Sequence, residues 1–358
     1  MLNSDLDALI GQMFVVGLQG LAVDADFKES YRRCPFGGFI LFERNVFDAN
    51  QLKELIADLN DCTSGRHRDY GKPLICVDQE GGNISPLKKV VPSMPGNMGL
   101  GATRDPEFAR YAGYITGRDL TSLGINLNLA PVLDLAREPV NPVVSTRAFS
   151  DNPDRVAALG KAYATGLQQA GVLFTAKHFP GHGSVTEDSH VTLPVSDAST
   201  DELLAADLIP FKKVMSLANS AMMTSHVVFR GLDPNFPATL SRVLVEEFLR
   251  GELAFDGVVI TDCLEMNGIR TIGPVPDVAV LAVEAGCDLL LISHTPELQA
   301  AAFLAVRNAV RTGRISIPRI RQSIERITRW KMARLSLRVL HPEFHVQPGS
   351  CLTPEFIG

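Results

Sequence analysis

The chain has 358 residues and a formal net charge of −6, and 46% of its residues are hydrophobic, a composition typical of a globular enzyme. No basic cluster exceeds a few residues, which argues against nucleic acid as the main partner. No apolar stretch reaches the ~20 residues that a membrane span needs, and the N-terminus lacks the basic start and apolar stretch of a secretory signal.

The six cysteines are scattered along the chain and form no zinc-binding spacing. This pattern disfavours both a disulfide framework and a structural metal. We therefore expect a cytoplasmic protein with reduced thiols and no cofactor.

Short apolar runs recur along the chain and are predicted to be β-strands. They span residues 13–17, 38–42, 74–78, 125–134, 172–179, 222–229, 257–262 and 289–294. Runs such as GVVIT and LLLIS are apolar at nearly every position, which is typical of strands buried on both faces of a parallel sheet.

The stretches between these runs have helical periodicity. The predicted helices span residues 50–59, 105–123, 152–170, 201–217, 240–253 and 277–285. Several open on a capping residue followed by Pro or an acid, as in Asp105-Pro106-Glu107, Asn152-Pro153-Asp154 and Thr200-Asp201-Glu202. A final amphipathic helix is predicted at residues 317–335, with one stripe formed by Ile317, Ile320, Ile324 and Ile327.

Eight strands with intervening helices predict an α/β fold, a single (β/α)₈ TIM-type barrel, which usually takes about 250 residues plus insertions. A doubly wound open sheet is the alternative, but no GxGxxG pattern follows the first strand. We expect residues 1–340 to form the catalytic barrel and residues 341–358, rich in Pro and Gly, to lie along its surface.

Polar side chains end three of the predicted strands, which is where catalytic groups lie in such barrels. They are Asp78, the pair Lys177-His178, and Asp262. Any one such carboxylate can simply cap the following helix, but three polar strand ends converge on one rim. Asp134 also ends a predicted strand, and we interpret it as a loop carboxylate that shapes the rim.

Two further histidines are given structural interpretations. His226, inside the sixth predicted strand, is expected to be a hydrogen-bonded core residue, and His182 a loop residue that bonds backbone carbonyls. His178, His182 and His190 do not predict a zinc site, because Pro180 and Gly181 prevent a helix from placing the first two on one face.

The segment from 177 to 190 reads KHFPGHGSVTEDSH, and with it the sequence resembles family 3 glycoside hydrolases. The likeness is to the bacterial β-N-acetylglucosaminidases of the peptidoglycan-recycling (NagZ) type. Further matches follow in the expected order along most of the chain: GGFILF at 37–42, DQEGG at 78–82, APVLD at 130–134, RAF at 147–149 and FDGVVITD at 255–262. The resemblance implies a single-domain barrel that acts on a small carbohydrate substrate.

By this resemblance Asp262 is the nucleophile of a retaining mechanism that passes through a covalent glycosyl-enzyme. The acid/base is His190, paired with Asp188. An imidazole titrates near ~6.5, which suits both proton donation and proton abstraction at neutral pH, and a carboxylate beside it orients the ring. Without the resemblance, this segment would be interpreted as a solvated polar loop.

The resemblance assigns sugar binding to Asp78, Arg147, Lys177 and His178. One departure from the family concerns this function. The family usually has two arginines after DQEGG, whereas this chain has Asn83 and Pro86 at those positions. Lys88 or Lys89 can supply charge there, but an ammonium does not reproduce a planar guanidinium, so the identity of the sugar is open.

The leading hypothesis is an exo-β-N-acetylglucosaminidase that acts on cell-wall fragments. Three alternatives remain open from the sequence. A histidine donor leaves the site less negative than a carboxylate donor does, so phosphate can replace water and make the enzyme a glycoside phosphorylase. The missing arginines are also compatible with a hydrolase for a different sugar, or with a sugar-binding protein of weakened catalysis. The sequence does not indicate an oligomeric state.

Overall fold

The structure is a computed structural model that describes residues 2–64, 70–138, 141, 143–185, 187–189 and 191–336. The predicted catalytic residue His190 and the predicted tail, 341–358, lie outside the described residues. The division into a barrel and a tail therefore stays a prediction.

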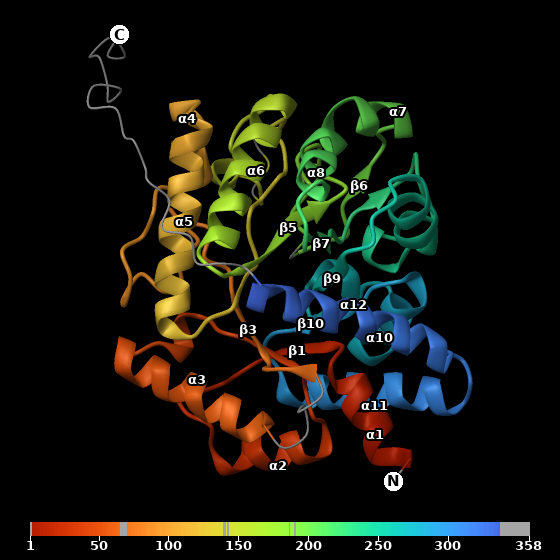
Figure 1. The fold of residues 1–358 in the computed structure, drawn as a ribbon. Helices are drawn as coiled ribbons and strands as arrows, with labels where there is room; N and C mark the ends of the chain where they lie inside the picture. The colour runs from red at the N-terminus through yellow and green to blue at the C-terminus, as the bar shows by residue number, and fades with distance from the viewer. Residues whose placement is uncertain are drawn as a thin grey trace.

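Eight parallel strands close into a barrel in the order β1-β10-β9-β7-β5-β4-β3-β2, with helices around them (Figure 1). The strands are β1 (Phe14–Gly17), β2 (Gly38–Ile40), β3 (Leu74–Val77), β4 (Leu127–Asn128), β5 (Leu173–Phe179), β7 (Ala221–Thr224), β9 (Val258–Cys263) and β10 (Leu289–Ile292). Pairing of Phe14 with Leu290 closes the barrel. The predicted TIM-type fold is confirmed.

Burial explains why these runs form barrel strands. All four residues of β1, β3, β7 and β10 are buried. A parallel strand covered by helices on one face and by the barrel core on the other has no position for an exposed polar side chain. The near-continuous apolar runs therefore identified these strands correctly.

Two predicted strands are shorter in the structure. The run at 125–134 pairs regularly only at Leu127–Asn128, because Pro131 lacks the N–H that a regular ladder requires. The run at 222–229 leaves the barrel after Thr224, and its end forms β8 (Val228–Phe229), which pairs with β6 (Val195–Ser196) in a separate two-stranded sheet.

The predicted helices are present, some in several pieces. They are α3 (Ala49–Thr63), α5 (Pro106–Leu123), α6 (Pro153–Gln169), α10 (Val275–Ala285) and α12 (Ile317–Ser336). The stretch 201–217 divides into α7 (Thr200–Glu202), the π-helical η4 (Leu203–Asp207) and α8 (Leu208–Met215), and 240–253 becomes the short turn η5 (Ala238–Leu240) and the π-helical η6 (Val243–Glu252).

Further helices were not predicted. They are α1 (Leu2–Gly11), α2 (Ala25–Arg33), α4 (Asn97–Thr103), α9 (Asn267–Arg270) and α11 (Pro296–Arg311), together with the short turns η1 (Glu43–Asn45) and η3 (Ser145–Arg147). Among the helices in the described part of the chain, none is both long and apolar enough to cross a membrane.

Local chemistry sets the helix starts. The Asp105 and Asn152 carboxyl and amide oxygens accept backbone N–H bonds in the first turns of α5 and α6, as predicted. The third predicted cap is wrong by one residue: Ser199, not Thr200, forms a capping box with Glu202. In α12, Ile320, Ile324 and Ile327 are buried but Ile317 is exposed, so the predicted stripe begins one turn later.

Candidate active site

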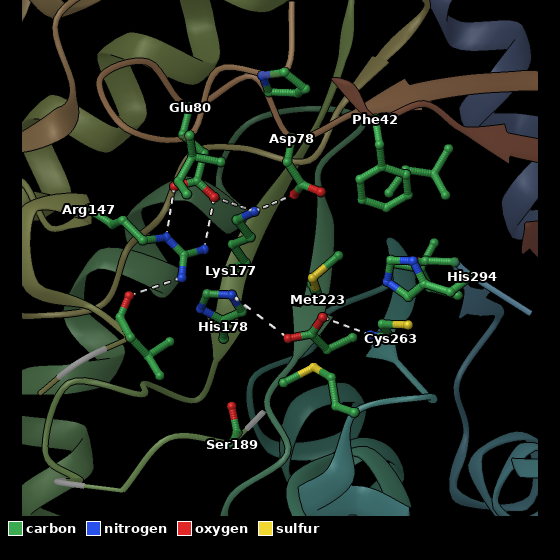
Figure 2. A pocket seen from close by; sticks show the side chains of 18 of the residues that line it. Phe42, Asp78, Glu80, Arg147, Lys177, His178, Ser189, Met223, Cys263 and His294 are labelled. Carbon is green, nitrogen blue, oxygen red and sulfur yellow. Dashed lines mark hydrogen bonds and ion pairs between the residues drawn. The ribbon is translucent and has the colours of Figure 1, made fainter. Parts of the chain in front are cut away.

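A cavity of about 670 Å³ opens at the carboxyl ends of the barrel strands. Its wall includes predicted site residues from three strand ends: Asp78 after β3, Lys177 and His178 on β5, and Asp262 on β9. Figure 2 shows most of the labelled side chains converging on this space. The barrel therefore brings together residues as far apart in the sequence as Asp78 and Asp262.

Lys177 lies at the centre of the charged part of the cavity. Its Nζ is 2.6 Å from Oδ1 of Asp78 and 2.6 Å from Oε1 of Glu80. Burial by itself would lower the pKa of Lys177, but the two carboxylates raise it above its usual value. The ammonium is thus a fixed donor at the cavity wall.

Glu80 holds Arg147 as well as Lys177. The Arg147 guanidinium donates to both Glu80 oxygens, from Nε at 2.9 Å and from Nη2 at 2.8 Å. Burial would raise the pKa of Glu80, but these two cations lower it to about 2. A buried carboxylate that is ionised and bidentately paired sets the orientation of both donors.

Glu80 is a functional residue for which no role was predicted from the sequence. The signal was present in the DQEGG segment, where Glu80 follows a strand end. Two cations at distant positions, Arg147 and Lys177, also required a counter-charge if they were to be buried.

Asp134 orients the His178 side chain. The Asp134 carboxylate is fully buried, lies 2.6 Å from Nδ1 of His178 and accepts the backbone N–H groups of His178 and His182 at 3.2 and 2.7 Å. Burial would raise the pKa of Asp134, but the adjacent His178 lowers it. Asp134 therefore shapes the rim as predicted, and does so as a buried support.

Asp262 presents a partly exposed carboxylate to the cavity. Its Oδ1 accepts the backbone N–H of Cys263 at 2.7 Å, and its Oδ2 is 3.9 Å from Nε2 of His178. Burial would raise the pKa of Asp262, but His178 and His226 lower it to about 2. This carboxylate is ionised at neutral pH and can act as a nucleophile toward a bound electrophilic carbon.

His226 supports the same strand end. Its Nδ1 is 2.8 Å from Oγ1 of Thr239 and its Nε2 is 3.0 Å from the carbonyl oxygen of Cys263, and the residue is buried. The prediction of a hydrogen-bonded core histidine is confirmed.

The segment after β5 includes Asp188, which is partly buried and whose carbonyl accepts the N–H groups of Val191 and Thr192, both at 2.9 Å. Ser189 lines the same cavity as Asp262. Nε2 of His182 is 3.0 Å from Oγ of Ser189. The expectation that His182 bonds backbone carbonyls is wrong, because Ser189 is near it in space and supplies a hydroxyl.

The residues that depart from the family pattern also line the cavity. Asn83, Pro86 and Lys88 lie in its wall. Lys88 and Lys89, considered as replacements for the missing arginines, are 3.1 and 3.5 Å from the Glu43 carboxylate. Both ammonium groups are therefore paired with the Glu43 carboxylate.

The opposite part of the wall consists of residues for which the sequence predicted no role. Phe42 and Arg44 follow β2, Glu265 follows β9 and His294 follows β10. His294 ends a predicted strand, so the strand-end criterion could have found it. Within the described residues, no group of three His, Cys, Asp or Glu side chains has the geometry of a metal site.

Comparisons with known proteins identify the family to which the chain is similar. The model of the glycosyl hydrolase family 3 N-terminal domain matches residues 5–330. A protein of Alkalilimnicola ehrlichii named beta-hexosaminidase is 34% identical over 340 residues, 91% of this chain and 95% of that protein. A protein of the same name from Thioalkalivibrio sulfidiphilus is 37% identical over 296 residues, 81% of this chain and 82% of that protein.

Solved structures show the same similarity. A glycoside hydrolase family 3 beta-N-acetylglucosaminidase from Paenibacillus superposes with a TM-score of 0.89 at 41% identity, over 98% of this chain and 66% of that longer chain. A beta-N-acetylhexosaminidase from Beutenbergia cavernae superposes with a TM-score of 0.78 at 30% identity, over 92% of this chain and 98% of that chain.

Proposed function

This chain belongs to glycosyl hydrolase family 3, and on that premise we propose that it is a retaining exo-β-N-acetylglucosaminidase. The observation that carries the proposal is the Asp262 carboxylate, with a pKa lowered to about 2, at a strand end in the cavity. The name of the similar Paenibacillus enzyme supports the choice of N-acetylglucosamine as the sugar.

In the proposed first step Asp262 attacks the anomeric carbon. A bond forms between a carboxylate oxygen and this carbon while the bond to the leaving oxygen breaks, and that oxygen takes a proton from His190. Water then attacks the same carbon, His190 takes a proton from the water, and the bond to Asp262 breaks. Asp188 orients His190 and stabilises its charged form.

Asp78, Lys177, Arg147 and His178 are proposed to bind the sugar. Asp78 accepts hydrogen bonds from hydroxyls, and the two cations donate to them. Because Glu80 already holds both cations in place, the hydroxyls meet donors that need no reorganisation. A substrate that lacks one of these hydroxyls leaves a buried group unpaired and is rejected.

We propose cell-wall fragments with a terminal N-acetylglucosamine as the natural substrates, and a role in peptidoglycan recycling in the cytoplasm. The resemblance to recycling enzymes supports this role, and the scattered cysteines support the cytoplasmic location. We also propose that residues 1–340 form one catalytic domain and residues 341–358 a surface tail. A hydrolase for another sugar is the second candidate, because Asn83 and Pro86 line the cavity where arginines are usual.

The test is an activity panel with aryl β-N-acetylglucosaminide, β-glucoside and β-xyloside, using the wild type and Asp262→Asn. We expect the first substrate to be preferred, and Asp262→Asn to reduce its turnover by at least about 10³-fold. A ring-fluorinated N-acetylglucosaminyl fluoride, whose covalent intermediate is hydrolysed slowly, should add one sugar to Asp262. Mass spectrometry of the peptide that contains Asp262 measures this adduct. Preference for glucoside or xyloside would favour the second candidate, and unchanged turnover in Asp262→Asn would refute the assigned nucleophile.

A further inference from the structure

The cavity has a second part that the proposed sugar-binding residues do not use. Its volume of about 670 Å³ is in the range that buries a drug-sized ligand, which is larger than a single monosaccharide. Figure 2 shows Phe42 and His294 together on the side opposite Arg147 and Glu80. Cys263, the chain neighbour of Asp262, lies on the same side as His294.

Phe42 and His294 form a continuous aromatic surface at this side. Their ring centroids are 5.3 Å apart, with an angle of 33° between the ring planes. Phe42 is half-buried and His294 is exposed, and both line the cavity. Aromatic rings that line a polar cavity offer an apolar surface for ligand stacking.

Arg44 fixes the position of this surface. Its guanidinium carbon lies 4.4 Å from the centre of the Phe42 ring. Nε and Nη2 donate to the carbonyl oxygens of Leu18 at 2.8 Å and Ser293 at 2.7 Å, and Nη1 is 3.3 Å from Nδ1 of His294. The cation thus connects the segments that follow β1, β2 and β10.

Two further contacts hold the surface in place. The Glu265 carboxylate accepts the backbone N–H groups of His294 at 2.6 Å and Thr295 at 2.9 Å. Gly17 allows Arg44 to approach, because a Cβ at this position would lie 3.1 Å from Nη2 of Arg44 and 1.8 Å from the Ser293 carbonyl oxygen. Such bracing preorganises the two rings before a ligand binds.

We propose that Phe42 and His294 form the subsite for the leaving-group sugar, a pyranose ring whose C–H face stacks on the two aromatic rings. The inference rests on the proposed function, because the anomeric carbon must then lie next to Asp262. The glycosidic oxygen joins the leaving sugar to that carbon. The charged half of the cavity holds the cleaved sugar, so the leaving sugar extends toward Phe42 and His294.

The test compares two substrates with the same N-acetylglucosamine donor. N,N′-diacetylchitobiose carries a pyranose leaving group, whereas β-N-acetylglucosaminyl fluoride has no leaving ring. Phe42→Ala and His294→Ala should each lower kcat/KM for the disaccharide roughly three- to tenfold more than for the fluoride. Phe42→Tyr, which retains the ring, should keep the wild-type ratio. Phe47→Ala is the matched control, because Phe47 is close in sequence but 71% exposed and outside the cavity wall.

Equal losses for both substrates, or no loss for either, would overturn the subsite. A wild type that hydrolyses neither substrate would instead refute the proposed function. A binding measurement keeps the two failures distinguishable: in the Asp262→Asn background, calorimetric titration should show that Phe42→Ala weakens binding of the disaccharide more than that of N-acetylglucosamine. Equal weakening, or none, would overturn the subsite without any need for turnover.

Discussion

Nε2 of the His182 imidazole lies 3.0 Å from Oγ of Ser189. Both residues are 2% exposed, so this contact is shielded from water. The backbone N–H of His182 donates to Asp134 at 2.7 Å, and the Ser189 carbonyl accepts the N–H of Gly268 at 3.2 Å. The pair therefore connects the support beneath His178 to the segment that includes Asp188.

Removal of the Ser189 hydroxyl should destabilise the protein. Ser189→Ala leaves Nε2 of His182 buried without its partner, so we expect the free energy of unfolding to fall by about 1–2 kcal/mol, measured by urea denaturation. Ser189→Thr retains a hydroxyl and should lose less. The exposed Ser122→Ala serves as the control. Equal stability of Ser189→Ala and wild type would show that the contact contributes nothing.

His182 should make stability depend on pH. Burial lowers the pKa of His182 from 6.5 to about 4, so between these values the unfolded chain binds the proton more readily than the folded one. The contribution of His182 to stability should therefore fall as pH falls from 6.5 toward 4, by up to about 3 kcal/mol. Denaturation of both proteins across this range should show the wild type losing stability relative to His182→Gln, which cannot take up the proton, as pH falls. A difference that does not change with pH would contradict the prediction.

Asp207 should have the opposite effect. Its carboxylate is 1% exposed and 3.3 Å from Nη1 of Arg137, and neither oxygen accepts a hydrogen bond from the described residues. Burial raises the pKa of Asp207 from 3.8 to about 6, so the folded state holds the proton more tightly and the contribution of Asp207 to stability falls as pH rises through this range.

The variant Asp207→Asn cannot ionise and should gain stability relative to wild type as pH rises from 3.8 to about 6, by up to about 3 kcal/mol. Denaturation of both proteins at several pH values measures this difference. Asp201→Asn, at an exposed carboxylate, is the control. A stability difference that does not change with pH would show that Asp207 titrates normally.

Loss of the Glu80 charge should strongly destabilise the protein. Glu80→Gln leaves Arg147 without its carboxylate partner and removes one of the two carboxylates beside Lys177. Breaking a buried ion pair from one side lowers the free energy of unfolding by about 3–5 kcal/mol. Glu43→Gln, at a partly exposed carboxylate, removes the partner of Lys88 and Lys89 and should have a much smaller effect on thermal unfolding. Similar effects of the two variants would contradict the assigned role of Glu80.

Local sequence pattern was sufficient for the barrel and for part of the site. An apolar run buried on both faces needs no knowledge of its neighbours to be recognised, and a polar residue that ends such a run must lie at the rim. Asp78, Lys177, His178 and Asp262 were found in this way and all line one cavity. The same criterion overextended the strand at 125–134, because only Leu127–Asn128 has a regular pairing partner.

The pairing of charges and rings was decided by tertiary structure alone. Glu80 meets Arg147 across 67 residues, and Arg44 meets His294 across 250. The contact between Arg44 and His294 exists because barrel closure brings β10 beside β1, and β1 beside β2. Hydrogen bonds and ion pairs act over a few ångströms, so a sequence can supply the groups for such a pair, but the closed backbone selects which of them meet.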